Sequence, residues 1–219
     1  GDELFGGYSR YNHIDNIWKK INYFPLSTRN LISKILTYPL QEKSIYSRYK
    51  SKTLTNLSKR IISGTNLINS ETIDKLYLHV ITQIPFPEDV VHDGYLKETK
   101  LDDLKPSFGD ISNIEKMMAT DTINYLPDDI LTKVDRAAMR TSLETRVPFL
   151  DHNIVEFAWR LPISYKVKEG ESKWPLQQIL KDFLPESLTK REKMGFSVPI
   201  HEWIRGPLSE WCEELLNKD

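Results

Sequence analysis

The sequence has very little cysteine, no long apolar run and no large excess of charge of either sign. Cys212 is the single cysteine, which excludes an internal disulfide and a zinc site built on several cysteines. The 30 basic and 31 acidic residues leave a formal net charge of −1, so a strongly basic nucleic-acid-binding protein is not expected. Because the apolar runs are short, we expect no membrane-spanning helix. These features favour a globular protein in a reducing, cytoplasmic location.

The hydrophobic residues recur mainly with the period of an α-helix. At 219 residues the chain is long enough for one domain, or one domain and part of another. A short strand or hairpin is predicted over residues 165–170, and the absence of alternating strands and helices makes the expected fold class mainly α. The predicted helices cover residues 11–24, 28–38, 54–62, 70–84, 113–126, 128–144, 152–159, 173–184 and 201–217, the last interrupted at 206–207.

Single residues predict several helix ends. Ser27 is expected to be the N-cap of a helix that ends at Pro39, and Asp151 the N-cap of the helix after it. Gly64 is expected to stop the helix before it, and Pro127 to follow the end of another. The apolar residues expected to face inward include Leu31, Ile32, Ile35 and Leu36 in the second helix, and Ile130, Leu131, Val134, Ala137, Ala138 and Leu143 over residues 128–144.

The chain opens with an unusual segment, Gly-Asp-Glu-Leu-Phe-Gly-Gly-Tyr, at residues 1–8. Glycines let a backbone approach a ligand closely, and a neighbouring carboxylate can hold a Mg²⁺ ion that is shared with substrate phosphates. This pattern favours a nucleotide site, although a flexible chain end before a helix is an alternative. Because the segment looks like the middle of a functional loop and has no initial Met, we expect a piece of a longer protein.

Two pairs of charged residues lie in the second half of the chain. Asp135 and Arg136 are adjacent on a predicted helix, so they point in different directions and need separate partners. Glu144 and Arg146 flank a predicted helix end, and the planar guanidinium of Arg146 is suited to a carboxylate or phosphate. Structural ion pairs and helix capping are the alternatives for these residues.

Lysines supply the remaining candidates for binding an anion. Lys173 follows a turn that contains Gly170 and opens a helix, where its ammonium and the first helical amides could face an anion. An exposed surface lysine is the alternative. The basic run at residues 190–193 indicates a segment that faces solvent or an anion, and the five histidines show no metal-ligand spacing.

Taken in order, these segments resemble the synthetase domain of the glutamine-hydrolysing asparagine synthetases, in their bacterial type. Residues 1–8 are similar to the end of the family motif Ser-Gly-Asp-Gly-Gly-Asp-Glu-Leu-Phe-Gly-Gly-Tyr. Further similar blocks lie at residues 126–139, 142–151, 173–174 and 193–203, whereas residues 30–115 carry little family signal. The order and spacing of five blocks across almost the whole chain make the resemblance specific.

The resemblance implies a fold and a domain organisation. It places residues 1–219 in the helical C-terminal part of an α/β synthetase domain of the PP-loop ATP pyrophosphatase (adenine-nucleotide α-hydrolase-like) type, as one helical lobe. The pyrophosphate loop Ser-Gly-Gly-x-Asp-Ser and the glutaminase domain of the family are absent from these residues and are expected upstream. We therefore expect the 219 residues alone to be inactive, with weak affinity for ATP at best.

The resemblance also implies a chemistry. Members of the family use ATP to activate the side-chain carboxylate of aspartate as β-aspartyl-AMP, and ammonia then attacks the acyl carbon. The ammonia comes from glutamine, which a separate N-terminal glutaminase domain hydrolyses. By motif position, Asp2 corresponds to a Mg²⁺-binding aspartate, with Gly1 and Glu3 beside the nucleotide. Lys173 corresponds to a lysine that stabilises negative charge on pyrophosphate or on the tetrahedral intermediate.

Four further residues fall in family blocks that line the site. Asp135 and Arg136 are assigned to the nucleotide side, and Glu144 and Arg146 to catalysis. One of the two arginines is expected to bind a substrate carboxylate, with the acids orienting it or the incoming amine. A homodimer is an assembly that the resemblance allows.

Two other functions remain open from the sequence. The first is a related amidotransferase that amidates another carboxylate, such as a sugar uronic acid, because the family blocks describe carboxylate activation better than the acceptor. The second is a helical interaction domain without catalysis, in which Asp2 and Lys173 could be changed freely.

Overall fold

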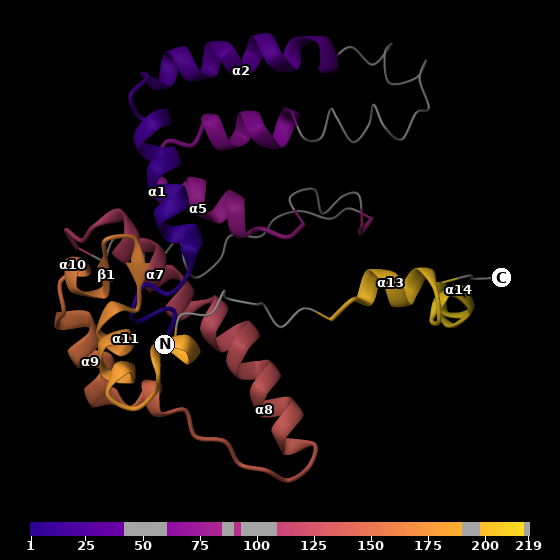
Figure 1. The fold of residues 1–219 in the computed structure, drawn as a ribbon. Coiled ribbons are helices and arrows are strands. Elements are labelled where there is room, and N and C mark those ends of the chain that lie inside the picture. Colours follow the sequence, from indigo (N-terminus) through magenta and orange to yellow (C-terminus); the bar gives the residue numbers. More distant parts are fainter. Residues whose placement is uncertain (42–60, 85–89, 93–108, 190–197, 217–219) are drawn as a thin grey trace. The chain divides into compact units, whose positions relative to one another are not determined.

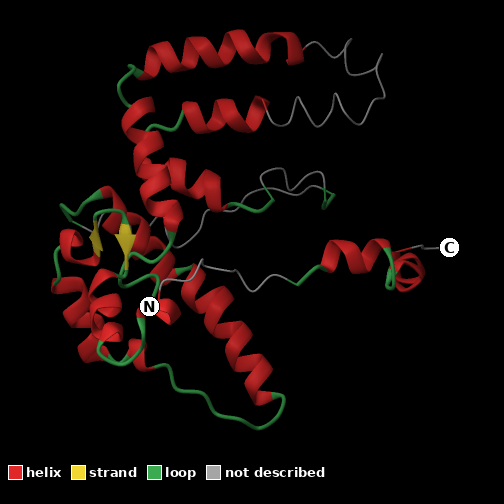
Figure 2. Ribbon diagram, in the orientation of Figure 1, coloured by secondary structure: helices red, strands yellow, loops and turns green. Residues whose placement is uncertain are grey.

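The computed structural model describes residues 1–41, 61–84, 90–92, 109–189 and 198–216 (Figure 1). In these residues the chain is mostly helical, and the strands are limited to one short antiparallel pair (Figure 2). The mainly α fold class expected from the sequence is therefore confirmed. Among the described helices, none is long and apolar enough to cross a membrane.

The first part of the described chain carries α1 (Ser9–Ile21), α2 (Leu26–Gln41), a helical stretch at residues 61–68, and α5 (Ile73–Ile81), followed by α7 (Asn113–Ile123). The second part carries η3 (Leu126–Leu131), α8 (Thr132–Met139), η4 (Pro148–Leu150), α9 (His152–Arg160), α10 (Ile163–Lys166), β1 (Val167–Lys168), β2 (Glu171–Ser172), α11 (Trp174–Lys181), α12 (Glu186–Thr189), α13 (Ile200–Arg205) and α14 (Ser209–Leu216).

The contacts within the chain divide it into two compact units, Gly1–Leu176 and Gln177–Asp219. The first unit holds both clusters of buried apolar side chains and all the motifs that carry the candidate site. The second unit contains α13 and α14, which are separated at residues 206–208, as the Gly-Pro pair at 206–207 predicts. The single lobe implied by the resemblance stays a prediction.

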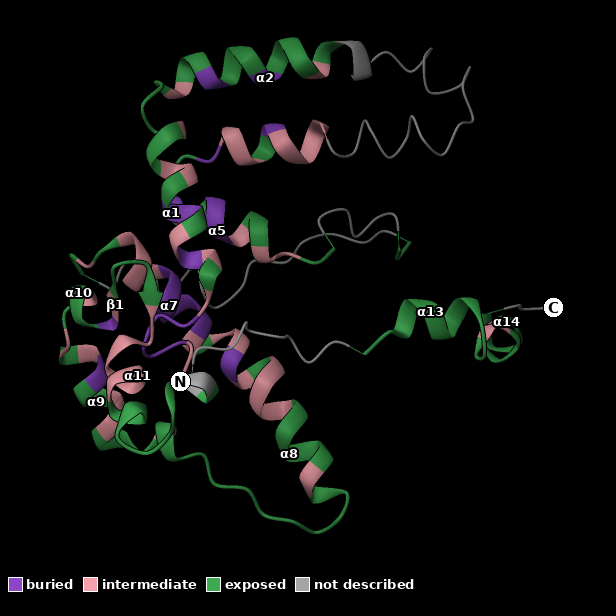
Figure 3. Cartoon of the chain, viewed as in Figure 1, coloured by how far each residue is buried: buried purple, intermediate pink, exposed green. Residues whose placement is uncertain are grey.

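The main core of the first unit lies where α1, α5 and α7 meet (Figure 3). Each helix contributes apolar side chains at helical spacing, as the periodicity predicts: Tyr11 and Ile14 from α1, Ile73, Leu76 and Tyr77 from α5, and Met117 and Met118 from α7. A smaller cluster joins Leu4 and Phe5 to Ala158 of α9. This second cluster anchors the beginning of the chain, which contains the candidate nucleotide-binding motif at residues 1–8.

Two helix starts have strong local capping. The carboxylate of Asp151 accepts a hydrogen bond from the backbone N–H of Asn153 at 2.9 Å, so its prediction as an N-cap is confirmed. At the start of α7, Ser112 and Glu115 each accept a hydrogen bond from the backbone N–H of the other, a reciprocal capping box. The predicted hairpin is also confirmed, with Val167 opposite Ser172 and Lys168 opposite Glu171.

Two predicted helix ends are wrong, and a third is confirmed. Ser27 lies inside α2, which begins at Leu26 and continues through Pro39 to Gln41. Gly64 lies within the helical stretch 61–68 and does not stop it. Pro127 follows the end of α7 at Ile123, as predicted. It lies in the first turn of the π-helix η3, where its missing N–H costs little because the first amides of a helix have no intrahelical acceptor.

Two predicted inward faces are also wrong. In α2 the side chains of Leu31, Ile32, Ile35 and Leu36 are exposed, and α8 has no buried residue. Periodicity identifies an amphipathic face, but it does not identify what packs against that face.

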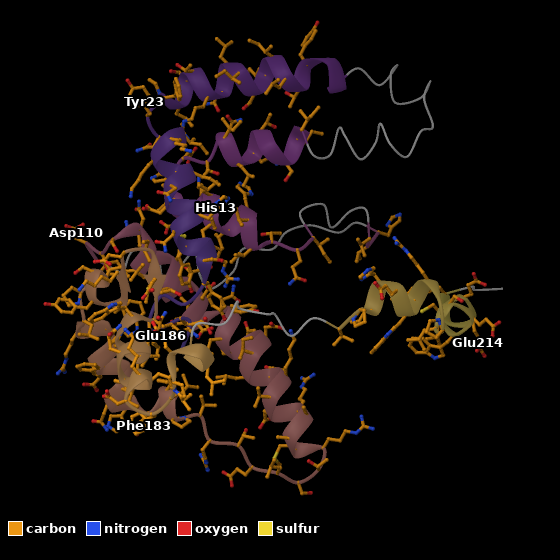
Figure 4. The ribbon with its side chains drawn as sticks, viewed as in Figure 1. His13, Tyr23, Asp110, Phe183, Glu186 and Glu214 are labelled. Atoms are coloured by element: carbon orange, nitrogen blue, oxygen red, sulfur yellow. The ribbon has the colours of Figure 1, made fainter. Side chains whose placement is uncertain are left out.

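The turn between α1 and α2 also carries an exposed aromatic side chain, Tyr23, which is labelled in Figure 4 and is 84% exposed. Most of the predicted helix at 54–62 and the basic run at 190–193 lie outside the described residues.

Candidate active site

Residues 1–8 form a tight loop that packs against the smaller core cluster. The backbone N–H of Phe5 donates to the carbonyl of Gly1 at 3.1 Å, and that of Gly7 donates to the carbonyl of Asp2 at 2.8 Å. Leu4 and Phe5 are buried, so apolar packing and turn hydrogen bonds together fix the loop. The glycine-rich segment therefore forms a hydrogen-bonded turn in this structure.

The loop brings Asp2 to Lys173, which is distant in sequence. Their ion pair joins Oδ2 of Asp2 and Nζ of Lys173 at 2.8 Å, with the side chains 25% and 31% exposed. The backbone N–H of Lys173 also donates to the carbonyl of Phe5 at 3.1 Å. Lys173 directly precedes the first residue of α11. The ion pair is therefore held by backbone contacts and remains accessible to a ligand.

Glu3 points into the protein. Its side chain is buried, and Oε1 accepts a hydrogen bond from the hydroxyl of Tyr8 at 2.6 Å. Burial and this hydrogen bond raise the pKa of Tyr8 well above its ordinary value, so the tyrosine stays neutral as a donor. The structure thus gives Glu3 a part in holding the loop, and its contact with a nucleotide stays a prediction.

A second group of predicted residues lines an open cavity of about 700 Å³. Asp135 comes from α8, and Arg146 comes from the segment that precedes η4. Arg146 forms an ion pair with Glu144, and both side chains are largely exposed. Arg136 is exposed and does not line this cavity. The remaining lining residues are Leu131, Val134, Thr145, Val147, Pro148, Leu150 and Asp151.

Phe149 connects the two groups. Its ring packs edge-on against Phe5, with 6.1 Å between the ring centroids. A Cβ atom on Gly1 would lie 3.4 Å from the same ring, so Gly1 is in close contact with it. The beginning of the chain therefore packs against η4, which follows Glu144 and Arg146 in the sequence. Together the two groups offer a carboxylate, an ammonium and a guanidinium, the set needed to hold a cation and two anionic groups.

The structure also contains a polar network that the sequence analysis missed. Oδ2 of Asp121, which is fully buried, accepts hydrogen bonds from Arg10 at 2.5 Å and from the hydroxyls of Tyr11 and Tyr77, each at 2.7 Å. The guanidinium of Arg10 also stacks 4.1 Å from the centroid of the Tyr8 ring. One sequence signal was available, since Asp121 follows Met117 and Met118 at the spacing of a buried helix face.

This network has clear electrostatic consequences. Burial, followed by the charge of Asp121 and the hydrogen bond to it, raises the pKa of Tyr11 and of Tyr77 above the ordinary value. Burial has the largest single effect on Arg10 and would lower its pKa, but the hydrogen bond to Asp121 and the charges of Tyr77, Asp121 and Tyr11 together outweigh it, and the pKa rises. Arg10 and Asp121 also line a cavity of about 550 Å³ with Tyr125 and residues from the end of α5. The network links Asp121, through Arg10 and Tyr8, to Glu3 beneath the loop.

A family model and several curated proteins are similar to this chain, and the matches described here agree on its family. The family model described as asparagine synthase matches residues 1–219. The chain is 28% identical to asparagine synthetase [glutamine-hydrolyzing] 1 of Bacillus subtilis over 220 residues, which cover 99% of this chain and 32% of that protein. It is 30% identical to a putative asparagine synthetase [glutamine-hydrolyzing] of Mycobacterium tuberculosis over 216 residues, which cover 96% of this chain and 30% of that protein.

A more distant relative is the amidase chyE of Penicillium rubens, with 30% identity over 105 residues that cover 45% of this chain and 16% of that protein. No solved structure matches the chain. The chain thus spans about a third of the length of the two bacterial relatives named above. Because the family model covers every residue, the chain belongs to the asparagine synthase family.

Proposed function

We propose that the whole protein is an ATP-dependent ligase that forms asparagine from aspartate, and that this chain supplies one side of its synthetase site. The observation that carries the proposal is the 2.8 Å ion pair between Asp2 and Lys173. These residues come from separate blocks of the family pattern, and their pairing places a carboxylate beside an ammonium at an accessible surface. That arrangement suits a Mg²⁺–phosphate group, with the cation at Asp2 and the anion at Lys173.

The proposed reaction has two steps. An oxygen of the aspartate side-chain carboxylate attacks the α-phosphorus of ATP, and the bond to pyrophosphate breaks, giving β-aspartyl-AMP. Ammonia then attacks the acyl carbon, AMP leaves and the amide forms. Lys173 holds the negative charge that develops on the pyrophosphate and on the tetrahedral intermediate, where a fixed ammonium is most effective. The ammonia is proposed to come from glutamine hydrolysed by another domain, in a cytoplasmic enzyme that forms homodimers.

The residues fit a Mg²⁺ ion that is shared with a nucleotide. In the described part of the chain no group of three or more His, Cys, Asp or Glu side chains could enclose a metal ion. Mg²⁺ in phosphate-transfer sites needs only one or two carboxylates, because phosphate oxygens and water complete its shell. Asp2 offers such a carboxylate beside Gly7, where a Cβ atom would fill the space. The ion would supply charge neutralisation for the phosphates.

The cavity that contains Asp135 and Arg146 is the proposed place for the acceptor carboxylate. Arg146 is the better candidate of the two arginines, because it lines the cavity whereas Arg136 does not. Glu144 pairs with Arg146 and would orient its guanidinium or accept a proton from the incoming amine. We propose that Asp135, Arg136, Gly1 and Glu3 contribute to the part of the site that binds the nucleotide.

The proposal is tested by changing Lys173 to Met in the whole protein. We expect kcat for aspartate-dependent pyrophosphate release to fall about 100- to 1,000-fold, as for the loss of one preorganised donor to a developing anion. Lys168→Met is the matched control, since Lys168 is exposed and lies in the hairpin that directly precedes Lys173. Asp2→Asn should raise the Mg²⁺ concentration needed for half-maximal activity. Unchanged rates in both variants would support a helical interaction domain without catalysis.

The 219 residues alone are proposed to be inactive. The chain lacks the Ser-Gly-Gly-x-Asp-Ser segment that cradles pyrophosphate in the family. The measurement is asparagine formation from ATP, aspartate and ammonia by the isolated chain, with the whole protein as the positive control. Asparagine formed by the isolated chain at the rate of the whole protein would contradict this point.

A related amidotransferase acting on another carboxylate is the second candidate. Its support is that the described lining of the larger cavity, with Arg146 as its basic residue, fits a carboxylate without being specific for aspartate. Pyrophosphate release by the whole protein should be compared with aspartate and with uronic acids as the acceptor. A higher kcat/KM for a uronic acid would replace aspartate as the substrate.

A further inference from the structure

Gly7 lies directly against the two functional groups of the loop. Its backbone N–H donates to the carbonyl of Asp2 at 2.8 Å and so closes the turn that carries the Asp2 carboxylate. A Cβ atom built on Gly7 would come well inside 3.0 Å of both Oδ1 of Asp2 and Cε of Lys173. It would also lie 2.9 Å from the backbone Cα of Asp2. Atoms this close repel strongly, so any side chain at this position would displace a neighbour.

The neighbours differ in how easily they can move. The backbone of Asp2 is held by the turn hydrogen bond, and that of Lys173 by its hydrogen bond to Phe5 at 3.1 Å. The loop also packs tightly against the β1–β2 hairpin at Gly6, because a Cβ atom on Gly6 would lie 2.8 Å from Cγ2 of Val167. The carboxylate of Asp2 and the side chain of Lys173 would therefore be displaced before the backbone segments separate.

The requirement at Gly7 concerns space. Gly6 has φ of +65°, a conformation that favours glycine, whereas Gly7 is not among the residues with positive φ. Alanine can therefore adopt the backbone conformation of Gly7, and the Gly7→Ala change adds only the clash. Gly64 is a suitable comparison, because among the described residues no atom outside its own helix backbone and chain neighbours lies within 4 Å of a Cβ atom built there.

We propose that Gly7 is a positioning residue, whose lack of a side chain sets the distance and orientation of the Asp2 carboxylate relative to the Lys173 ammonium. The inference rests on the proposed function, because it takes a divalent cation and phosphate oxygens to be bound side by side by these two groups. Displacing a reacting group by about 1 Å can cost a factor of about 100 in rate. Gly7 thus contributes to the reaction through Asp2 and Lys173, without touching substrate itself.

The first test uses Gly7→Ala in the whole protein, with Gly64→Ala as the control. Binding of Mn²⁺ without nucleotide is followed by electron paramagnetic resonance, and folding by circular dichroism. We expect Gly7→Ala to stay folded, to bind Mn²⁺ about tenfold more weakly, and to lower kcat about 100-fold with a smaller change in KM for aspartate. Gly64→Ala should leave Mn²⁺ binding and kcat at the wild-type values. Wild-type Mn²⁺ binding and turnover in Gly7→Ala would overturn the proposal.

A double variant separates positioning from a general structural role. In an Asp2→Asn protein the carboxylate is already lost, so adding Gly7→Ala should reduce Mn²⁺ binding by less than twofold further. The full tenfold loss in that background would show that Gly7 acts elsewhere, and would contradict the proposal. If Gly7→Ala alone does not fold, combining it with Asp2→Ala and Lys173→Ala should restore folding, because this removes both side-chain atoms that clash, Oδ1 of Asp2 and Cε of Lys173. Failure of both variants to fold would overturn the proposal.

The experiments distinguish failure of the proposed role of Gly7 from failure of the proposed ligase function. A wild-type protein that releases no pyrophosphate from ATP with aspartate or uronic acids would contradict the ligase. The Mn²⁺ measurement would still decide whether Gly7 positions Asp2. Conversely, an active wild type with impaired Asp2→Asn and Lys173→Met variants, but a fully active Gly7→Ala variant, would contradict the role of Gly7 alone.

Discussion

The guanidinium of Arg10 contacts the carboxylate of Asp121 at 2.5 Å, across 111 positions of the sequence. Asp121 is fully buried, whereas the side chain of Arg10 remains 31% exposed and stacks on Tyr8. Tyr8 in turn donates to Glu3, the residue after Asp2. A buried ion pair in the main core therefore supports the loop that carries the candidate site. Because one partner is fully buried, removing the other charge should be costly.

Asp121→Asn is expected to lower the free energy of unfolding by about 3 kcal/mol or more, since it leaves Arg10 without its buried counter-charge. Tyr77→Phe should cost about 1 kcal/mol, because it removes one hydrogen bond to the same oxygen. Denaturant unfolding of the whole protein measures both. The control is Glu71→Gln, which breaks an exposed pair with Lys75 and should leave stability unchanged. Equal stability of Asp121→Asn and wild type would contradict the supporting role.

Lys166 is a second buried charge, and it lacks a hydrogen-bond partner in the described structure. Its Nζ lies 5.0 Å from the centroid of the Trp159 ring, and its side chain is fully buried. Burial lowers its pKa below the ordinary value of 10.5, and the charge of Glu115 opposes this only in part. We expect Lys166→Met to raise the free energy of unfolding at neutral pH by about 1 kcal/mol, because an unpaired buried charge is removed.

The lowered pKa of Lys166 also gives a pH dependence with a definite sign. Between the pKa in the folded state and 10.5, the unfolded chain binds more protons at this site than the folded chain does. The contribution of Lys166 to stability therefore rises with pH across that range and is constant above it. Urea unfolding of wild type and Lys166→Met from neutral to alkaline pH measures the difference. A parallel pH dependence of the two proteins would show that Lys166 does not titrate in this way.

Arg146→Gln tests the cavity in which Arg146 and Asp135 lie. If Arg146 binds the acceptor carboxylate, its loss should raise KM for that acceptor about 10- to 100-fold, as for one charged hydrogen-bonding group. KM for ATP should change much less. Arg160→Gln is the control, because Arg160 is also exposed and paired with a glutamate, Glu156. An unchanged KM for the acceptor would exclude Arg146 from binding it.

Gly6→Ala is expected to destabilise the loop through strain as well as contact. Gly6 has φ of +65°, and a Cβ atom there would meet Val167. The strained backbone conformation alone should cost about 1 kcal/mol. Adding Val167→Ala removes the contact, so the double variant should recover part of the stability and keep the remaining strain. Thermal unfolding provides the measurement, and no recovery in the double variant would show that the contact with Val167 is unimportant.

The local structure was largely predictable from the sequence. The N-cap at Asp151, the hairpin after Lys166 and the break at residues 206–207 each depend on a few neighbouring residues. The ends predicted at Ser27 and Gly64 failed because a single residue biases a helix end only weakly. The exposed apolar residues of α2 show the same limit, because amphipathicity does not specify a packing partner.

The sequence by itself determined the mainly α class, the capped helices, and the motifs that contain Asp2, Lys173 and Arg146, because these depend on residues close together in the chain. Only the tertiary structure decided which of these side chains meet. It paired Asp2 with Lys173, turned Glu3 inward toward Tyr8, and placed Arg146 in a cavity without Arg136. Such contacts between distant segments arise from the packing of the core and from backbone hydrogen bonds between loops, and no local pattern encodes them.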